Sequence, residues 1–132
     1  MLAWEGVGRL ASAVGELKRI LGEFNSAYGV SMSAIVSRSG IPIAWVMPQG
    51  MPIENFAALA ATLLGASEVI YTGMSKPAPS RVVVESKDGV LVVSGLGPKA
   101  FVAAMFQSSD SEIDSAMEKV GRAAMDVLKG QG

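Results

Sequence analysis

The stretch RVVVESKDGVLVVSG, Arg81 to Gly95, decides the fold because it predicts a β-hairpin at the border of a sheet. Two valine-rich halves flank the turn-forming run Lys87-Asp88-Gly89. The first half, Arg81–Ser86, is short and follows two nearby prolines, a context typical of an edge strand. An exposed apolar edge strand readily pairs with another chain. The hairpin therefore raises the question of whether this edge is left open, covered or used.

The rest of the chain predicts three helices and three further strands. Spacings of three and four residues between apolar positions indicate the helices, and alternation indicates the strands. Strands joined by hairpins favour an antiparallel sheet with helices on its faces, which makes the fold an α+β sandwich. The predicted elements are a helix at about Gly8–Ala27, strands at Val30–Arg38 and Ile41–Met47, a helix at about Ile53–Gly73, the hairpin, a strand at Lys99–Gln107, and a last helix ended by Gly130. Pro42 cannot donate a hydrogen bond within a sheet, which favours an edge position for the second strand.

The predicted middle helix, Ile53–Gly73, has an unusual composition. It carries only two charged residues, Glu54 and Glu68, and much of its remaining surface is alanine, glycine or threonine. A helix with so little charge is buried on more than one side, and small residues let a second helix approach closely. We expect its main apolar stripe to be Phe56, Leu59, Ala60, Leu63, Ser67, Ile70 and Met74, widened by Ile53, Ala57, Leu64 and Tyr71.

Composition limits the classes of function. The chain has 132 residues, of which 50% are apolar and 17% are charged, a balance typical of one globular domain. We expect that domain to span residues 8–130, with residues 1–7 as a short extension. The net charge of −1 gives no basic surplus for nucleic acid or anionic lipid. The start lacks the pattern of a signal peptide, and no run of about 18 apolar residues occurs. A cytoplasmic protein that contacts neither nucleic acid nor membrane is expected.

The usual catalytic groups are missing from the sequence. The chain has no cysteine and no histidine, which excludes thiolate catalysis, zinc–sulfur sites and a Ser-His-Asp triad. Gly95-Leu96-Gly97-Pro98-Lys99 lacks the spacing of a phosphate loop and indicates a turn. Asp110, Glu112 and Asp114 favour the start of the last helix, with a weak Mg²⁺ site as the alternative. We expect no catalytic residue, no cofactor and no metal.

Three stretches, taken in order and spacing, resemble the Roadblock family of dynein-light-chain-related domains, in the type found in archaea and bacteria. They are AIVSRSGIPIAW (Ala34 to Trp45), ENFAALAATLLGASEVI (Glu54 to Ile70) and RVVVESKDGVLVVSGLGPKAFVAAMF (Arg81 to Phe106). The resemblance covers about Gly8 to Lys129. It implies a three-layer, Roadblock/profilin-like α+β sandwich in the order α-β-β-α-β-β-β-α, with one helix on one face of a five-stranded antiparallel sheet and two on the other.

The resemblance also implies how the chain works. Such domains are typically homodimers, in which the middle helices pair and the third strands join edge to edge. They are non-enzymatic regulators or scaffolds that bind small Ras-like GTPases. Carried onto this chain, the dimer interface comprises Phe56, Ala60, Leu63, Leu64, Ser67, Val82 and Val84.

Two other classes of function stay open. Related α/β sandwiches hold small molecules between sheet and helix, so a small-molecule sensor is the alternative, and it would need an internal cavity with convergent polar groups. An enzyme is the third possibility, although neither cysteine nor histidine is present to act as an activated nucleophile or base.

Overall fold

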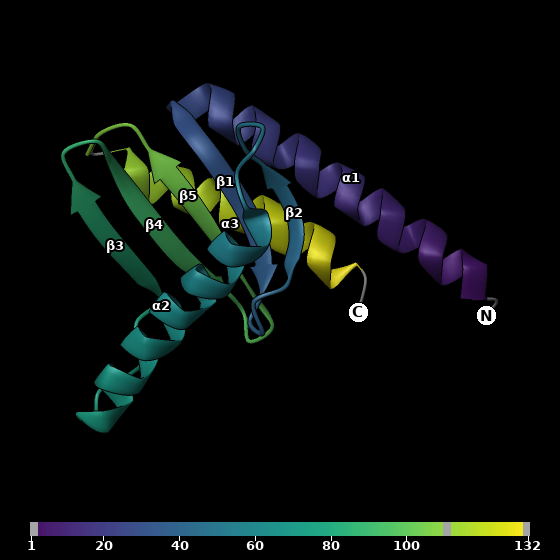
Figure 1. Ribbon diagram of the computed structural model, residues 1–132. Helices are drawn as coiled ribbons and strands as arrows, with labels where there is room; N and C mark the ends of the chain where they lie inside the picture. The colour runs from purple at the N-terminus through teal and green to yellow at the C-terminus, as the bar shows by residue number, and fades with distance from the viewer. Residues whose placement is uncertain (1–2, 110–111, 131–132) are drawn as a thin grey trace.

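The computed structural model of the chain describes residues 3–109 and 112–130 and contains eight elements (Figure 1). The predicted order α-β-β-α-β-β-β-α is confirmed. The elements are α1 (Ala3–Tyr28), β1 (Val30–Ser37), β2 (Pro42–Val46), α2 (Ile53–Gly73), β3 (Arg81–Ser86), β4 (Gly89–Leu96), β5 (Ala100–Phe106) and α3 (Ile113–Lys129).

The five strands form one antiparallel sheet in the order β2-β1-β5-β4-β3. Hairpins join β1 to β2, β3 to β4 and β4 to β5, and β5 crosses back to pair with β1 in the centre. Both strands that the sequence places at an edge, the proline-containing β2 and the valine-rich β3, lie at the two borders. Within the hairpin, Val82 faces Val93 and Val84 faces Leu91.

Helices cover the sheet unequally, two on one face and one on the other (Figure 1). The larger core lies under α1 and α3 and includes Leu17, Leu21, Val102 and Met117. The smaller core lies under α2 and includes Ala57, Leu64, Val93 and Phe101. This arrangement confirms the predicted three-layer sandwich with its one-plus-two division of helices.

One helix boundary differs from the prediction, and the structure shows which apolar residues of α2 meet the sheet. α1 begins at Ala3 rather than near Gly8. In α2 the buried residues are Ile53, Ala57, Ala60 and Leu64, at spacings of four, three and four. Of the stripe predicted to be the main one, Ala60 is buried and Phe56 and Leu63 are partly buried against the same cluster. Leu59, Ile70 and Met74 are exposed.

Candidate interaction surface

The middle helix is seated on the sheet only along its first half. The buried residues of α2 end at Leu64, and in Figure 1 its later turns project beyond the strands. Because a projecting helical segment has no sheet beneath it, apolar side chains such as Ile70 remain exposed there, although Glu68 is held by Arg38. The seat of α2 and its projecting end together define the surface considered below.

Two contacts from the β1–β2 turn fix the position of α2. Gly40 adopts a φ of +91°, and a Cβ built there would lie 3.3 Å from the Cα of Ala58, so only glycine allows this approach of turn and helix. Arg38 donates from Nη1 to both carboxylate oxygens of Glu68, at 2.9 and 3.0 Å.

Arg38 also ties α2 to the β4–β5 turn. Its Nε donates to the carbonyl of Ala100 at 3.3 Å and its Nη2 to the carbonyl of Gly97 at 3.2 Å. The pair with Glu68 joins residues 30 positions apart. Arg38 lies in the stretch AIVSRSGIPIAW that carries the family resemblance, but no local pattern in the sequence links this arginine to Glu68.

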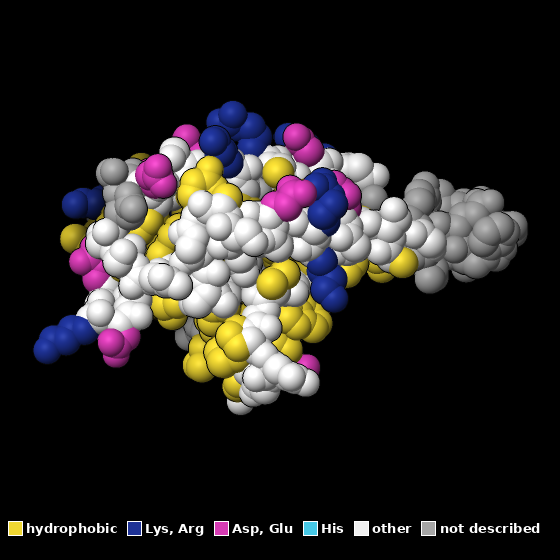
Figure 2. All heavy atoms as spheres, turned by 90° about the horizontal axis from the view of Figure 1, so that it is seen from above, with side chains coloured by type: hydrophobic (Ala, Val, Ile, Leu, Met, Phe, Trp, Pro, Cys, Tyr) yellow, Lys and Arg dark blue, Asp and Glu magenta, His cyan; other side chains and the backbone are white. Residues whose placement is uncertain are grey.

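The outer side of α2 is a continuous apolar stripe. We call the residues Phe56, Leu59, Leu63, Ser67, Ile70 and Met74, which recur every three or four positions, the outer stripe. Leu59, Ile70 and Met74 are 69%, 60% and 61% exposed. Seen from above (Figure 2), hydrophobic side chains gather with few charges along the lower margin, the side that α2 covers in Figure 1.

The outer stripe adjoins the exposed edge strand. Val82 of β3 packs against the same core cluster as Phe56 and Leu63 of α2. Because side chains alternate along a strand, Val84 shares the face of Val82, and it is 43% exposed. Within the sheet, β3 is paired only with β4. An apolar helix face and an unpaired strand border therefore form one surface.

The seven predicted interface residues divide into two groups. Ala60 and Leu64 are 4% and 1% exposed because they pack against the sheet of their own chain. Three others, Phe56, Leu63 and Val82, are partly buried at the border of that cluster. Ser67 is half-buried and its hydroxyl donates to the carbonyl of Leu64 at 2.7 Å. Val84 is exposed at the sheet edge. The surface available to a partner thus comes from five of the seven residues, and from Leu59, Ile70 and Met74 in addition.

α2 is also long and apolar enough to cross a membrane, by length and composition alone. This differs from the expectation that no segment of the chain has those properties. A helix that packs between two protein layers has the same composition, and residues 53–64 of α2 lie on the sheet. Its apolar character therefore indicates a second partner for the helix without identifying a lipid.

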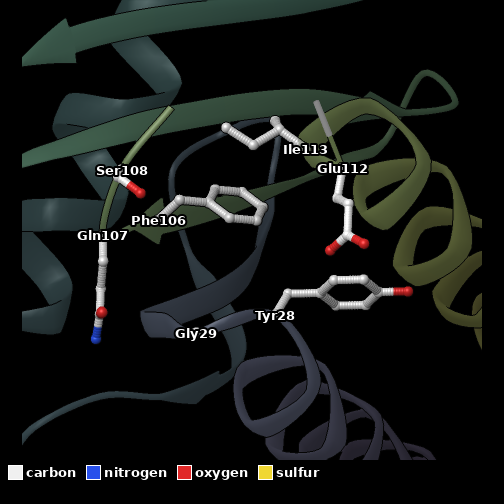
Figure 3. Close-up of a pocket in the computed structure, with 7 residues that line it drawn as sticks. All are labelled: Tyr28, Gly29, Phe106, Gln107, Ser108, Glu112 and Ile113. Carbon is white, nitrogen blue, oxygen red and sulfur yellow. The ribbon is translucent and has the colours of Figure 1, made fainter. Parts of the chain in front are cut away.

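A small pocket lies between the end of α1, the end of β5 and the start of α3 (Figure 3). Its volume is about 110 Å³, well below the roughly 300–1,000 Å³ of small-molecule sites. In Figure 3 the Gln107 side chain points away from Glu112, and the Phe106 ring lies between them. This pocket lacks the convergent polar groups that the sensor alternative requires.

The acidic residues at the start of α3 are not gathered as metal ligands in the described part of the chain. Asp114 accepts a hydrogen bond from Nη1 of Arg81 at 2.6 Å and is 85% exposed. Asp110 lies outside the described residues. Asp114 thus bridges α3 and the start of β3.

A protein-family model for the Roadblock/LC7 domain matches residues 16–106, which include the α2 surface and the β3 edge. The chain belongs to the Roadblock/LC7 family. The resemblance drawn from its three sequence stretches is thereby confirmed. No sequence among curated proteins matches the chain significantly.

Solved structures show the same fold at low sequence identity. An MglB with a tetrameric arrangement superimposes with a TM-score of 0.83 at 15% identity, covering 91% of this chain and 93% of the other. The gliding protein MglB from Thermus thermophilus gives 0.81 at 15% identity, with 89% and 92% covered. A Roadblock/LC7 domain from Streptomyces avermitilis gives 0.74 at 18% identity, with 85% and 97% covered. At these identities the likeness establishes the fold of this Roadblock/LC7 domain.

Proposed function

We propose that this Roadblock/LC7 domain is a non-enzymatic, cytoplasmic homodimer that binds a small Ras-like GTPase as a regulator or scaffold. The observation that carries the proposal is the apolar outer stripe of α2 beside the unpaired edge of β3. The two features occupy one surface of the molecule, so one partner can cover both.

Burial energetics support a partner on the outer stripe. Fully burying a leucine or isoleucine side chain contributes about 1.5–3 kcal/mol. In a single chain most of this stabilisation is absent for three side chains that remain exposed, namely Leu59, Ile70 and Met74. A second copy of α2 has the same apolar stripe and the small residues, such as Ala66, that allow close approach.

The strand edge supports the same partner. Two copies related by a twofold axis can place their β3 strands side by side in antiparallel fashion, which satisfies the free backbone groups of both. Val84 would then lie beside the partner strand. A heterologous partner could cover α2, but the self-complementary edge favours a second copy of the chain.

The GTPase part of the proposal comes from family membership. The resemblance to the Roadblock family implies small Ras-like GTPases as partners, and the family model covers the surface described above. In a homodimer, the surface of each chain outside the dimer contact would stay available to a GTPase. The domain would act by binding, because the sequence offers neither cysteine nor histidine for catalysis.

A pull-down with purified proteins tests the GTPase assignment. The immobilised chain is incubated with each small Ras-like GTPase of the same genome, loaded with GDP or with a non-hydrolysable GTP analogue. We expect one GTPase to be retained in a nucleotide-dependent manner. Failure of every GTPase to bind, or binding that ignores the nucleotide, would overturn this part of the proposal.

A further inference from the structure

A groove runs along the C-terminal half of α3, on the face of the sheet opposite α2. It consists of two adjoining hollows of about 400 Å³ each, which share Leu96, Met125 and Lys129. One hollow extends toward Arg81 at the start of β3, and the other toward Ile43 of β2. We call the two together the α3 groove. Each hollow is large enough to receive side chains of a partner.

Glycines shape the wall of the α3 groove. A Cβ at Gly121 of α3 would lie 3.4 Å from Cδ2 of Leu96. A Cβ at Gly97 would lie 3.5 Å from Cε of Met125, and Gly97 has a φ of +66°. The helix and the β4–β5 turn therefore meet closely at Leu96 while the space beside them stays open.

The floor of the α3 groove is apolar and adaptable. Leu96 and Met117 are buried, and Met125 and Leu128 are partly buried against the larger core. Methionine is unbranched and polarizable, so it can adjust to apolar side chains of different shape. The floor can therefore receive an aliphatic side chain from a partner.

The rim of the α3 groove is positively charged, although the chain as a whole carries a net charge of −1. Two acidic side chains, Glu118 and Asp126, line it, against four basic ones. The lining residues therefore carry a surplus of two positive charges, which falls to one when Asp114, the ion-pair partner of Arg81, is included. The basic residues are Arg81, Lys99, Arg122 and Lys129.

Arg81 has hydrogen-bonding capacity left over. Its Nη1 is bound to Asp114, but its Nε is buried and has no hydrogen-bond partner among the described residues. An unpaired buried donor costs roughly 1–3 kcal/mol. A carboxylate is the acceptor that fits an arginine best, because its two oxygens match the geometry of the guanidinium group. Since Nε is closed to solvent, a partner's carboxylate would reach it only if the Arg81 side chain turned toward the groove.

We propose that the α3 groove binds an acidic linear segment of a partner protein. An aliphatic side chain of the segment would lie on Leu96 and Met125, and neighbouring carboxylates would bind Arg81 and Arg122. The inference goes beyond the proposed function. Because the groove faces away from α2, a partner there does not compete for the outer stripe.

Fluorescence anisotropy with defined probes tests the proposal. The first probe is a short fluorescein-labelled peptide that alternates leucine and glutamate, and the second has glutamine at each glutamate position. We expect the glutamate probe to bind about tenfold or more tightly than the glutamine probe, as one lost charge contact predicts. Higher salt should weaken its binding.

Matched variants place the probe in the groove. Arg122→Gln should weaken binding of the glutamate probe about tenfold. Lys119→Gln removes the same charge from an exposed position of α3 outside the groove and should leave binding unchanged. Arg81→Gln gives a second groove variant, and thermal melting checks that each variant is folded. NMR signals of the Met125 methyl group should shift on titration.

Three outcomes would overturn the proposal. Equal binding of the two probes would remove the charge argument. If Arg122→Gln and Lys119→Gln weakened binding of the glutamate probe equally, binding would depend on overall charge and not on the α3 groove. Binding of inorganic phosphate in place of the glutamate probe, with the Met125 signal shifted only by phosphate, would assign the groove to a small anion.

Discussion

The helices α2 and α3 lie on opposite faces of one sheet and are alike on the inside but different on the outside. α3 buries Ile113, Ala116, Met117, Val120 and Ala124, and α2 buries Ile53, Ala57, Ala60 and Leu64. The outer side of α3 carries charged residues such as Lys119, whereas the outer stripe of α2 carries Leu59 and Ile70. The outer side of α3 has the charge expected of a solvated helix surface, and the outer stripe of α2 does not. The difference supports the proposal that a second copy of the chain covers α2.

The largest effect is expected on the outer stripe of α2. Ile70→Asp removes an exposed apolar side chain and places a carboxylate in the proposed dimer contact. A homodimer carries the change twice, and Ile70 is 60% exposed in one chain, so the loss of burial alone is about 2–4 kcal/mol, on the order of a hundredfold in the dissociation constant. Sedimentation velocity over a dilution series measures it.

The matched control is Lys119→Asp on the charged outer side of α3. It introduces the same side chain at an exposed position of the other helix and should leave the dissociation constant unchanged. If the two variants self-associate equally, the proposed difference between the helices has no functional meaning. Val84→Asp extends the comparison to the edge of β3 and should also weaken self-association.

Substitutions on the inner faces test the similarity of the two helices. Leu64 and Met117 are each 1% exposed. Leu64→Ala and Met117→Ala should each lower the free energy of unfolding by about 2–5 kcal/mol, since both leave a cavity in a packed core. Urea denaturation measures the change. A loss below about 0.5 kcal/mol for Leu64→Ala would mean that α2 is not seated as described.

A smaller effect is expected where the β1–β2 turn meets α2. Gly40→Ala places a Cβ 3.3 Å from the Cα of Ala58, at a φ of +91°. It should cost about 1–2 kcal/mol of folding stability. Gly15→Ala, in an exposed turn of α1 with no atom within 4 Å of the new Cβ, should instead stabilise by about 0.5–1 kcal/mol. Chemical denaturation of both variants measures the change in the free energy of unfolding, which should be negative for Gly40→Ala and positive for Gly15→Ala.

The smallest effect is expected on the charged surface of α1. Hydrogen bonds from Arg19 hold the pKa of Glu16 below its usual value. A carboxyl with a lowered pKa stabilises the fold at neutral pH, and this contribution is lost as the pH falls through its folded pKa. Glu16→Gln should therefore lower the melting temperature slightly at neutral pH and leave it unchanged in acid. If the melting temperatures of the unmodified chain and of Glu16→Gln differed as much in acid as at neutral pH, the role of the Glu16 carboxylate would be contradicted.

The sequence predicted those features that depend on local patterns. The valine-rich run Arg81–Ser86 and the proline at residue 42 placed both edge strands. The low charge of α2 predicts a helix with two partners, and its second partner remains a proposal. The sequence predicted two apolar stripes on α2 but did not show which of them meets the sheet. In the structure Ile53, Ala57, Ala60 and Leu64 are the buried residues.

Other features depend on contacts between distant residues. Arg38 and Glu68 are 30 positions apart, and the α3 groove combines Arg81 with residues of the last helix. No spacing in the sequence connects these positions. Of the predicted interface, the positions on α2 and β3 adjoin one another in the structure, but Ala60 and Leu64 are occupied by the core of their own chain.

The mass of the unmodified chain in solution tests the central claim most directly. Multi-angle light scattering after gel filtration gives this mass, and one chain has a mass of 13.6 kDa. We expect twice that value, because the outer stripe of α2 and the edge of β3 would be covered by a second copy. A mass of 13.6 kDa at every concentration would contradict the account and leave the apolar side of α2 to a different partner.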